Sequence, residues 1–321
     1  HDALPILALT GTPIENRLSE LWSIFDYLMP GFLYTYQKFR EEIETPIVVN
    51  KDENKMERLQ RMIRPFILRR LKGDVLKDLP EKLEENVYAK MEGEQLALYD
   101  AHVQQMKQML DGKSEAEFKS NKIQILAELT KLRQLCCDPA LVYENYEGGS
   151  AKLDLCIELI QSAVESGHKI LLFSQFTSMI EILTARLQEE SISCFVLQGS
   201  TKKEQRAQMV EQFNRDDTSV FCISLKAGGT GLNLTGADIV IHYDPWWNVA
   251  VENQATDRAH RIGQKNVVTV YKLIAKGTIE EKIIKLQQMK KELAEEILSG
   301  DEIKTASFQR EELLELLEER F

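Results

Sequence analysis

The sequence predicts an α/β fold, in which a parallel β-sheet has helices on both faces and carries additional helical subdomains. From residue 152 onward, short apolar segments alternate with amphipathic segments of helical periodicity. The apolar segments are nearly continuous, as in "KILLFS" at 169–174, which is typical of strands buried on both faces. Because strands that alternate with helices form parallel sheets, we expect ligands to bind outside the carboxyl ends of the strands.

The second half of the chain supplies the sheet. We expect strands at 169–174, 193–199, 219–225, 237–244 and 267–277. Between and before them we expect helices at 152–166, 177–189 and 201–213, and a further helix across 253–265. A long amphipathic helix rich in Lys and Glu is predicted at 278–298.

The first half is predicted to be mainly helical. It opens with an apolar, strand-like run at 4–11, followed by a helix at 19–30 that Pro30-Gly31 stops. A basic segment at 55–72 is interrupted by Pro65. The next elements are a charged connector at 76–85, a possible strand at 86–91, and two helices within 94–135 separated by the polar stretch 111–121.

Composition narrows the function classes. The 43% hydrophobic content is enough for a packed core and argues against a disordered chain, and the length of 321 residues favours two domains. The net charge of −11 argues against a surface that is basic all over, although a local basic groove remains possible.

The five cysteines lack the spacing of a metal site, so we expect reduced thiols and no metal ligands. We find no apolar run of about 18 residues and expect no membrane span.

Two stretches carry candidate anion-binding chemistry. "ISLKAGGTGLNL" at 223–234 places three glycines after a strand, where backbone N–H groups can approach an anion, although such a loop is also compatible with a plain turn. "NQATDRAHRIGQK" at 253–265 places Gln254, Arg258 and Arg261 at helical spacing. Asp257 beside them also fits a solvated helix face with ion pairs.

The order of these motifs resembles a known family. The run 223–264 resembles motifs V and VI of superfamily two helicase-like ATPases, specifically the Swi/Snf-type DNA translocases. "LALTGTPIENRLSELWSIFDYLMPGF" at 7–32 is similar to motif III and the residues after it, and 169–183 to motif IV. "LRRLKGDVLKDLPEK" (68–82) and "LRQLCCDP" (132–139) also match in order, whereas Val249 stands where the family usually has Pro.

The resemblance implies a RecA-like fold and an ATP site between two lobes. Arg258 and Arg261 match the arginines that reach the phosphates, and a guanidinium binds phosphate oxygens in a planar fork. The other residues that the resemblance assigns to the ATP site or to coupling are Gln254, Gly229, Thr10, Gly11 and Thr12.

The nucleotide-binding half is expected to lie elsewhere. The resemblance implies ATP with Mg as cofactor, held mainly by a P-loop and an Asp-Glu box in a first lobe. Gly112-Lys113-Ser114 lacks the first glycine of a P-loop, because residue 107 is Lys, and "DEIK" at 301–304 does not follow a strand. We therefore expect a fragment that is inactive alone and works with the N-terminal lobe of the same protein.

The resemblance also implies double-stranded DNA as partner, contacted through its backbone. The residues carried over to this role are Thr230, Gly231, Ser174, Gln175, Gly199, Ser200 and Trp246. A basic run could border a DNA groove or form a solvated helix face with ion pairs, and the sequence does not decide between them. Its members are Arg58, Arg61, Arg64, Arg69, Arg70 and Lys72.

These expectations define a domain plan and a function. The plan has the end of lobe one at 1–18, its helical subdomain at 19–78, a linker and helical subdomain at 79–150, the second RecA-like lobe at 151–277, and a brace helix and tail at 278–321. The predicted function is the C-terminal lobe of a DNA-dependent ATPase that translocates on duplex DNA. The alternatives are a nucleotide-independent interaction module that kept the fold and an RNA helicase lobe. We expect a cytoplasmic or nucleoid-associated protein in a prokaryote, or a nuclear one in a eukaryote.

Overall fold

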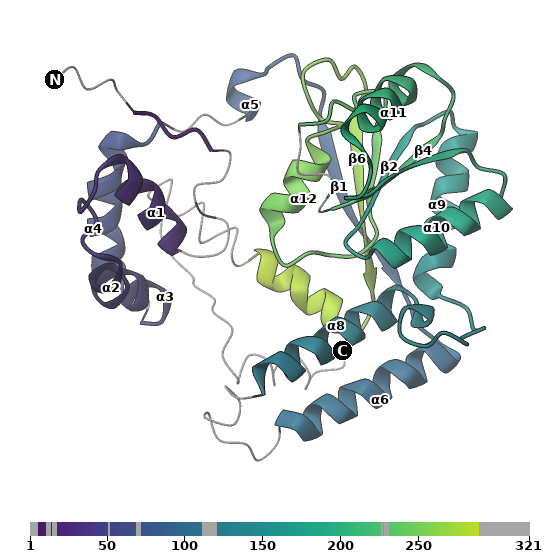
Figure 1. Ribbon diagram of the computed structural model, residues 1–321, viewed down its shortest axis with the longest axis horizontal. Helices are drawn as coiled ribbons and strands as arrows, with labels where there is room; N and C mark the ends of the chain where they lie inside the picture. Colours follow the sequence, from purple (N-terminus) through teal and green to yellow (C-terminus); the bar gives the residue numbers. More distant parts are fainter. Residues whose placement is uncertain are drawn as a thin grey trace. The chain divides into compact units, whose positions relative to one another are not determined.

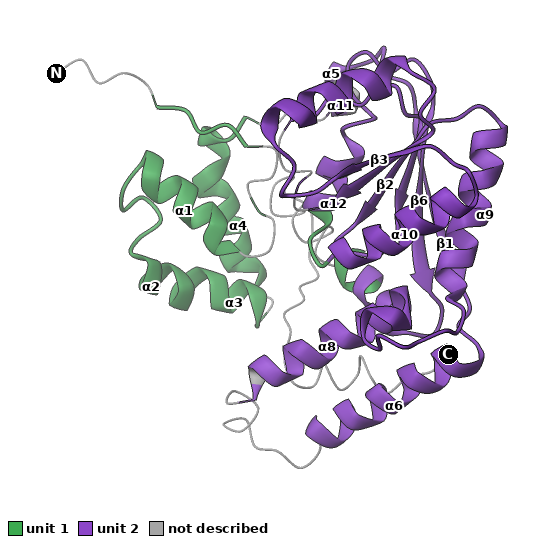
Figure 2. Ribbon diagram, turned by 45° about the vertical axis from the view of Figure 1, so that its right-hand side comes forward, with its two compact units in different colours: residues 1–71, 247–250, 285–308 green, residues 72–246, 251–284, 309–321 purple. Residues whose placement is uncertain are grey.

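The computed structural model describes residues 6–10, 14, 18–50, 52–68, 72–110, 121–225, 227 and 231–288. They divide into two compact units (Figure 2), the first built mainly from residues up to Leu71 and the second from Lys72–Trp246 and Val251–Ile284. The sequence placed the corresponding boundary after residue 78. The helix that starts at residue 279 is described through residue 288, so the rest of the helix predicted at 278–298 lies outside the described residues.

The first unit is helical and has its own core. Its elements are α1 (Leu18–Leu28), α2 (Tyr36–Phe39), a π-helical turn (Arg40–Glu44), α3 (Thr45–Val48), α4 (Glu53–Ile63) and a 3-10 turn (Arg64–Phe66). Helix α4 ends where Pro65 removes a backbone donor, as the sequence predicts. The apolar stripe of α1 packs with that of α4, and Leu21, Phe25 and Leu59 are fully buried there.

The strand predicted at 4–11 is wrong for the residues that the structure describes. Residues 6–10 form no strand, and the side chains of Leu7 and Leu9 are 82% and 96% exposed. An apolar run becomes a strand only when a neighbouring strand satisfies its backbone hydrogen bonds. None of the six strands of the described sheet pairs with this run.

The second unit is the predicted α/β layer structure (Figure 1). A parallel sheet has the strand order β1-β6-β5-β2-β4-β3. Its strands are β1 (Lys82–Ala89), β2 (Ile170–Ser174), β3 (Cys194–Leu197), β4 (Val220–Ser224), β5 (Ile239–His242) and β6 (Val268–Ala275). Its helices are α5 (Lys72–Val75), α6 (Gly93–Leu110), α8 (Lys122–Cys137), α9 (Ala151–Glu165), α10 (Thr177–Glu189), α11 (Lys203–Arg215) and α12 (Val249–Thr256), with a 3-10 turn at Pro139–Leu141.

Alternation along the strands explains the two layers. Leu172 and Cys222 face a core that α9 and α10 cover, whereas Leu171 and Phe221 face a core that includes Phe213 of α11. Both faces are therefore buried, as the continuous apolar runs predicted. All six strands of this sheet include a predicted strand segment, and β1 extends the possible strand at 86–91 toward the connector.

Helices α6 and α8 pack side by side at one end of the second unit (Figures 1 and 2). They are the two helices predicted within 94–135, and the polar stretch between them lies largely outside the described residues. The five cysteines are free thiols, in agreement with the sequence. Among the described residues, no helix is long and apolar enough to cross a membrane.

Candidate functional site

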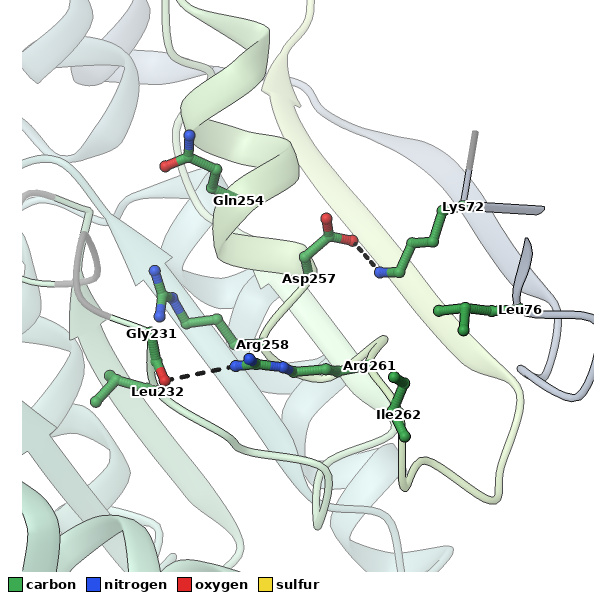
Figure 3. A pocket seen from close by; sticks show the side chains of 9 residues that line it. All are labelled: Lys72, Leu76, Gly231, Leu232, Gln254, Asp257, Arg258, Arg261 and Ile262. Atoms are coloured by element: carbon green, nitrogen blue, oxygen red, sulfur yellow. Dashed lines mark hydrogen bonds and ion pairs between the residues drawn. The ribbon is translucent and has the colours of Figure 1, made fainter. Parts of the chain in front are cut away.

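A pocket of about 460 Å³ in the second unit brings together the main candidate anion-binding residues (Figure 3). Gln254 comes from α12, Arg258 and Arg261 from the loop after it, and Gly231 from the segment after β4. The remaining lining residues are Lys72, Leu76, Leu232, Asp257 and Ile262. The structure therefore brings together four residues that the sequence assigned to the ATP or DNA sites.

The two arginines lie on a loop rather than on the predicted helix across 253–265. Helix α12 ends at Thr256, and tighter turns follow, such as the hydrogen bond from Arg258 N to Ala255 O at 3.2 Å. His242 at the end of β5 makes a 2.9 Å hydrogen bond to the Thr256 hydroxyl, which holds the end of the helix against the sheet. Gly263 then adopts a φ of 103°, a conformation open mainly to glycine, and reverses the chain.

Gln264 holds this loop in place. It is 7% exposed, and its Nε2 donates to the carbonyl oxygens of Ala237 at 2.7 Å and Ala259 at 3.2 Å. Its Oε1 accepts from the backbone N–H groups of Lys265 and Asn266. In addition, Leu234 N donates to Arg258 O at 3.0 Å. The arginine loop is therefore fixed to the segment after β4 by backbone and amide bonds, and the side chains of Arg258 and Arg261 line the pocket.

The pocket is electropositive. Arg258 is only 6% exposed, and burial lowers the pKa of its guanidinium. The nearby positive charges of Arg261 and Arg206 lower this pKa as well, while Asp257 opposes them. An arginine nevertheless stays protonated in proteins, so positive charges remain close together. Arg261 is exposed, and its Nη1 makes a long, 3.5 Å bond to Gly231 O (Figure 3). Such an arrangement favours an anionic ligand.

A lysine from the start of the second unit braces the same loop. Lys72 Nζ lies 2.7 Å from the Asp257 carboxylate (Figure 3). It also donates to His260 O. His260 Nε2 in turn bonds Pro80 O at 2.7 Å. The sequence suggested that Asp257 would form ion pairs on the arginine face, but the contact that the structure shows is with Lys72. Nothing local in the sequence signals this pairing, because the two residues are 185 positions apart.

A second group of candidates meets at the carboxyl ends of β2 and β5, which pair in parallel. Gln175 and Trp246 follow these strands and are half-buried. Ser174, however, is fully buried, and its hydroxyl donates to the Asp244 carboxylate at 2.6 Å. This position does not fit the predicted direct contact of Ser174 with DNA, because the hydroxyl is already bonded below the surface.

Sequence reasoning missed the residue that joins these two segments. Arg133, from the "LRQLCCDP" stretch on α8, is 4% exposed, and its Nη1 donates to Gln175 Oε1 at 2.9 Å. Its Nη2 donates to Pro245 O, and its guanidinium lies 5.6 Å from the centre of the Trp246 ring. Its position in a motif was the available signal, but the role depends on contacts made far along the chain.

The other predicted residues belong to neither of these two groups or lie outside the described residues. Gly199 and Ser200 are exposed in the turn after β3, at the edge of the sheet. Thr10 is exposed in the first unit. The candidates that lie outside the described residues are Gly11, Thr12, Gly229 and Thr230.

The basic run shows local pairing where it is described. Arg61 forms a 3.1 Å ion pair with Glu57 on α4, and Arg58 donates to the Tyr34 hydroxyl at 2.7 Å. Lys72 is paired as described above. Arg69 and Arg70 lie outside the described residues. These contacts are compatible with both readings of the basic run, so the solvated helix face and the DNA groove both stay predictions. In the part of the chain that the structure describes, no three His, Cys, Asp or Glu side chains are grouped to hold a metal ion.

Comparisons with known proteins agree with this architecture. The SNF2-related domain family matches residues 5–141, and the Helicase conserved C-terminal domain family matches residues 151–263. A solved structure of the Sulfolobus solfataricus SWI2/SNF2 ATPase C-terminal domain is 33% identical with a TM-score of 0.59. The similarity covers 74% of this chain and 99% of that one.

Two further matches concern longer proteins. The Sulfolobus solfataricus SWI2/SNF2 ATPase core in complex with dsDNA is 38% identical with a TM-score of 0.59, over 91% of this chain and 62% of that one. A Mycoplasma pneumoniae protein named "Uncharacterized ATP-dependent helicase" is 42% identical over 320 residues, which is 97% of this chain and 30% of that protein. The chain spans 30% to 32% of the length of three such bacterial relatives.

Proposed function

Because the chain belongs to the SNF2 family of helicase-like ATPases, we propose that it forms the arginine-bearing lobe of an ATP-driven translocase on double-stranded DNA. The observation that carries this proposal is the pocket in which Arg258 and Arg261 come together beside Gln254 and Gly231. Like charges held this close are stable only at a cost, and an anion offsets that cost. The phosphates of ATP are such an anion.

The residues of the pocket fit a phosphate group. Arg258 and Arg261 carry planar forks of N–H donors that bind phosphate oxygens, and the loop that bears them is fixed by Gln264. Stabilising the charge that spreads over a transferring phosphoryl group is worth about 10³–10⁵ in rate when an arginine supplies it. Gln254 lies at the rim of the same pocket, where it can orient the ligand or the attacking water (Figure 3).

The remaining parts of the nucleotide site are assigned outside this chain. Family resemblance gives ATP with Mg to a P-loop and an Asp-Glu box in the N-terminal lobe, and no described residue group suits Mg. Thr10, Gly11 and Thr12 keep the role of coupling ATP state to lobe closure. We therefore expect the fragment alone to be inactive and the full-length protein to be active.

Double-stranded DNA is the proposed second partner. The match to a SWI2/SNF2 ATPase core in complex with dsDNA supports this choice. The residues proposed to contact the DNA backbone are Gln175, Gly199, Ser200, Thr230, Gly231 and Trp246. Ser174 is not among them, because its buried hydroxyl bonds Asp244. Contacts of this type bind phosphates without reading bases, so we expect salt-sensitive binding with little sequence preference.

The decisive experiment measures ATP turnover by this fragment and by the full-length protein, each with duplex DNA, with duplex RNA and without nucleic acid. We expect turnover only by the full-length protein and a higher rate with DNA. A higher rate with RNA would instead support the RNA helicase lobe. No turnover under any condition would support the nucleotide-independent interaction module.

A further inference from the structure

A buried arginine, Arg133, connects the segments that follow β2 and β5. These two segments include residues to which we assign DNA contacts. Strands β2 and β5 are neighbours, with Phe173 opposite His242, so the residues after them lie side by side. Arg133 reaches this place from α8 and donates to both segments, to Gln175 Oε1 at 2.9 Å and to Pro245 O. Three elements that are distant in sequence therefore meet at one guanidinium group.

The guanidinium group of Arg133 also lies close to two aromatic rings. Its central carbon lies 5.8 Å from the ring centre of Phe176 and 5.6 Å from that of Trp246. A planar cation suits this position, since it can contact ring faces while it donates hydrogen bonds from its edge. A lysine ammonium has no such plane and cannot make this set of contacts.

A buried carboxylate compensates the positive charge of Arg133. Asp244 is fully buried, and its Oδ2 lies 3.8 Å from Arg133 Nη2. The same carboxylate accepts hydrogen bonds from the Ser174 hydroxyl at 2.6 Å and from Gln175 N at 3.2 Å. Arg133 and Asp244 thus fix both the backbone and the side chain of Gln175.

This contact sets the orientation of the Gln175 amide. A guanidinium group can only donate, so the oxygen of the amide must face Arg133 and the Nε2 donors must face away. Solvent does not reach Nε2 in this structure, and no acceptor for it is present among the described residues. Nε2 is therefore not presented to a ligand in this arrangement, and the contact with Arg133 acts by fixing the position of the Gln175 side chain and backbone.

We propose that Arg133 is a positioning residue for DNA binding. It holds Gln175 and the Pro245–Trp246 turn in one fixed arrangement, in which the half-buried Gln175 and Trp246 are positioned together for the DNA backbone. This inference rests on the proposed function, because it assumes that these segments contact DNA. Arg133 acts through Gln175 and Trp246 and does not itself touch the ligand.

The test uses the full-length protein and the conservative variant Arg133→Lys, which keeps the charge opposite Asp244 but loses the planar fork. The matched control is Arg186→Lys on α10, where an exposed arginine pairs with Glu189 and Glu190. For each protein we would measure the duplex DNA concentration that gives half-maximal stimulation of ATP turnover. We would also measure the maximal rate, the KM for ATP and the melting temperature.

We expect Arg133→Lys to raise the half-maximal DNA concentration about tenfold, the size expected for one lost hydrogen bond to a charged group. The maximal rate and the KM for ATP should stay at the wild-type values, because the arginine pocket is a separate site. Arg186→Lys should change none of these quantities. A merely structural role would lower the melting temperature and leave the half-maximal DNA concentration of the folded protein at the wild-type value, and that result would overturn the inference.

A second variant keeps the inference testable if Arg133→Lys does not fold. Gln175→Leu removes the amide and leaves Arg133 with Pro245 O and Asp244. It should raise the half-maximal DNA concentration to the same degree, and an unchanged value would overturn the inference. If the wild-type protein turns over ATP but does not respond to duplex DNA, the proposed function fails and the inference fails with it. If the wild type responds and the variants respond alike, only the inference fails.

Discussion

The arginine loop at 257–264 and the buried position of Arg133 present the same side-chain group in two environments. Arg133 donates to internal acceptors and lies opposite the buried Asp244. Arg258 lies near Arg261 and Arg206, and burial together with these charges lowers its pKa. Arg133 thus has a buried counter-charge within the fold, whereas Arg258 and Arg261 line a pocket in which positive charges exceed the single negative charge of Asp257.

The difference between the two environments distinguishes arginines that stabilise the fold from arginines that bind a ligand. A guanidinium that is surrounded by acceptors stabilises the fold, so its loss leaves buried groups without partners. A guanidinium that lines a pocket beside other cations can bind an anionic ligand, so its loss should affect the binding of that ligand. Each prediction below tests one side of this contrast, from the largest expected effect to the smallest.

The largest effect is expected for Arg258→Ala and Arg261→Ala in the full-length protein. Each should lower DNA-stimulated ATP turnover by about 10³-fold or more, because each removes donors from the transferring phosphate. The melting temperature of each variant, measured alongside, separates a loss of phosphate contacts from a loss of folded protein. Arg215→Ala, which removes an exposed arginine paired with Glu211, is the control for turnover and melting. Unchanged turnover in both pocket variants would reject the assignment of the loop.

Asp244→Asn tests the environment of the buried Arg133, the other member of the comparison. The change leaves Arg133 buried without its carboxylate, so we expect the free energy of unfolding to fall by about 3 kcal/mol. Urea denaturation measures this value, with Glu211→Gln as a control on an exposed ion pair, where the loss should be small. If Asp244→Asn unfolds at the same urea concentration as the wild type, the Asp244 carboxylate does not compensate the positive charge of Arg133.

A pH dependence is expected from His242, which holds the end of α12 below the arginine loop. Burial lowers its pKa from 6.5 to about 3, and the positive charge of Lys272 acts in the same direction. The unfolded chain therefore takes up the proton first as the pH falls. The stabilisation is complete above about pH 6.5 and is lost progressively toward pH 3, with a loss of about 2 kcal/mol at pH 5.

The His242→Gln variant isolates this effect, because the amide can still bond the Thr256 hydroxyl but does not titrate. The free energy of unfolding of the wild type should fall between pH 7 and pH 5 by more than that of the variant. Denaturation by urea at the two pH values gives both numbers. Equal losses in the two proteins would show that another group causes the pH dependence.

The smallest effect is expected for the exposed pair that braces the loop. Lys72 and Asp257 are 35% and 49% exposed, and such pairs contribute about 0.5 kcal/mol. Lys72→Ala should lower the melting temperature only slightly and lower DNA-stimulated turnover about twofold, through a less well fixed Arg258. Asp257→Asn should have the same effect, and the double variant should not be worse than either single one. Additive losses would mean that the two residues act separately.

Much of the fold could be predicted because its signals are local. Each buried strand of the second unit is a short, nearly continuous apolar run, and the intervening helices have clear amphipathic periodicity. The residue types of the arginine pocket could also be named from motif order. The prediction of a strand at 4–11 was wrong because an apolar run does not show whether a neighbouring strand is available.

The sequence by itself therefore determined the layers of the sheet and the residues that gather around the candidate phosphate site. Only the tertiary structure decided that α12 ends at Thr256, that Lys72 reaches Asp257, and that Arg133 holds Gln175. It also showed that Ser174 is buried against Asp244. The physical reason is the same in each case: periodicity and composition describe neighbours along the chain, whereas hydrogen bonds and ion pairs form with partners that only folding brings within about 3 Å.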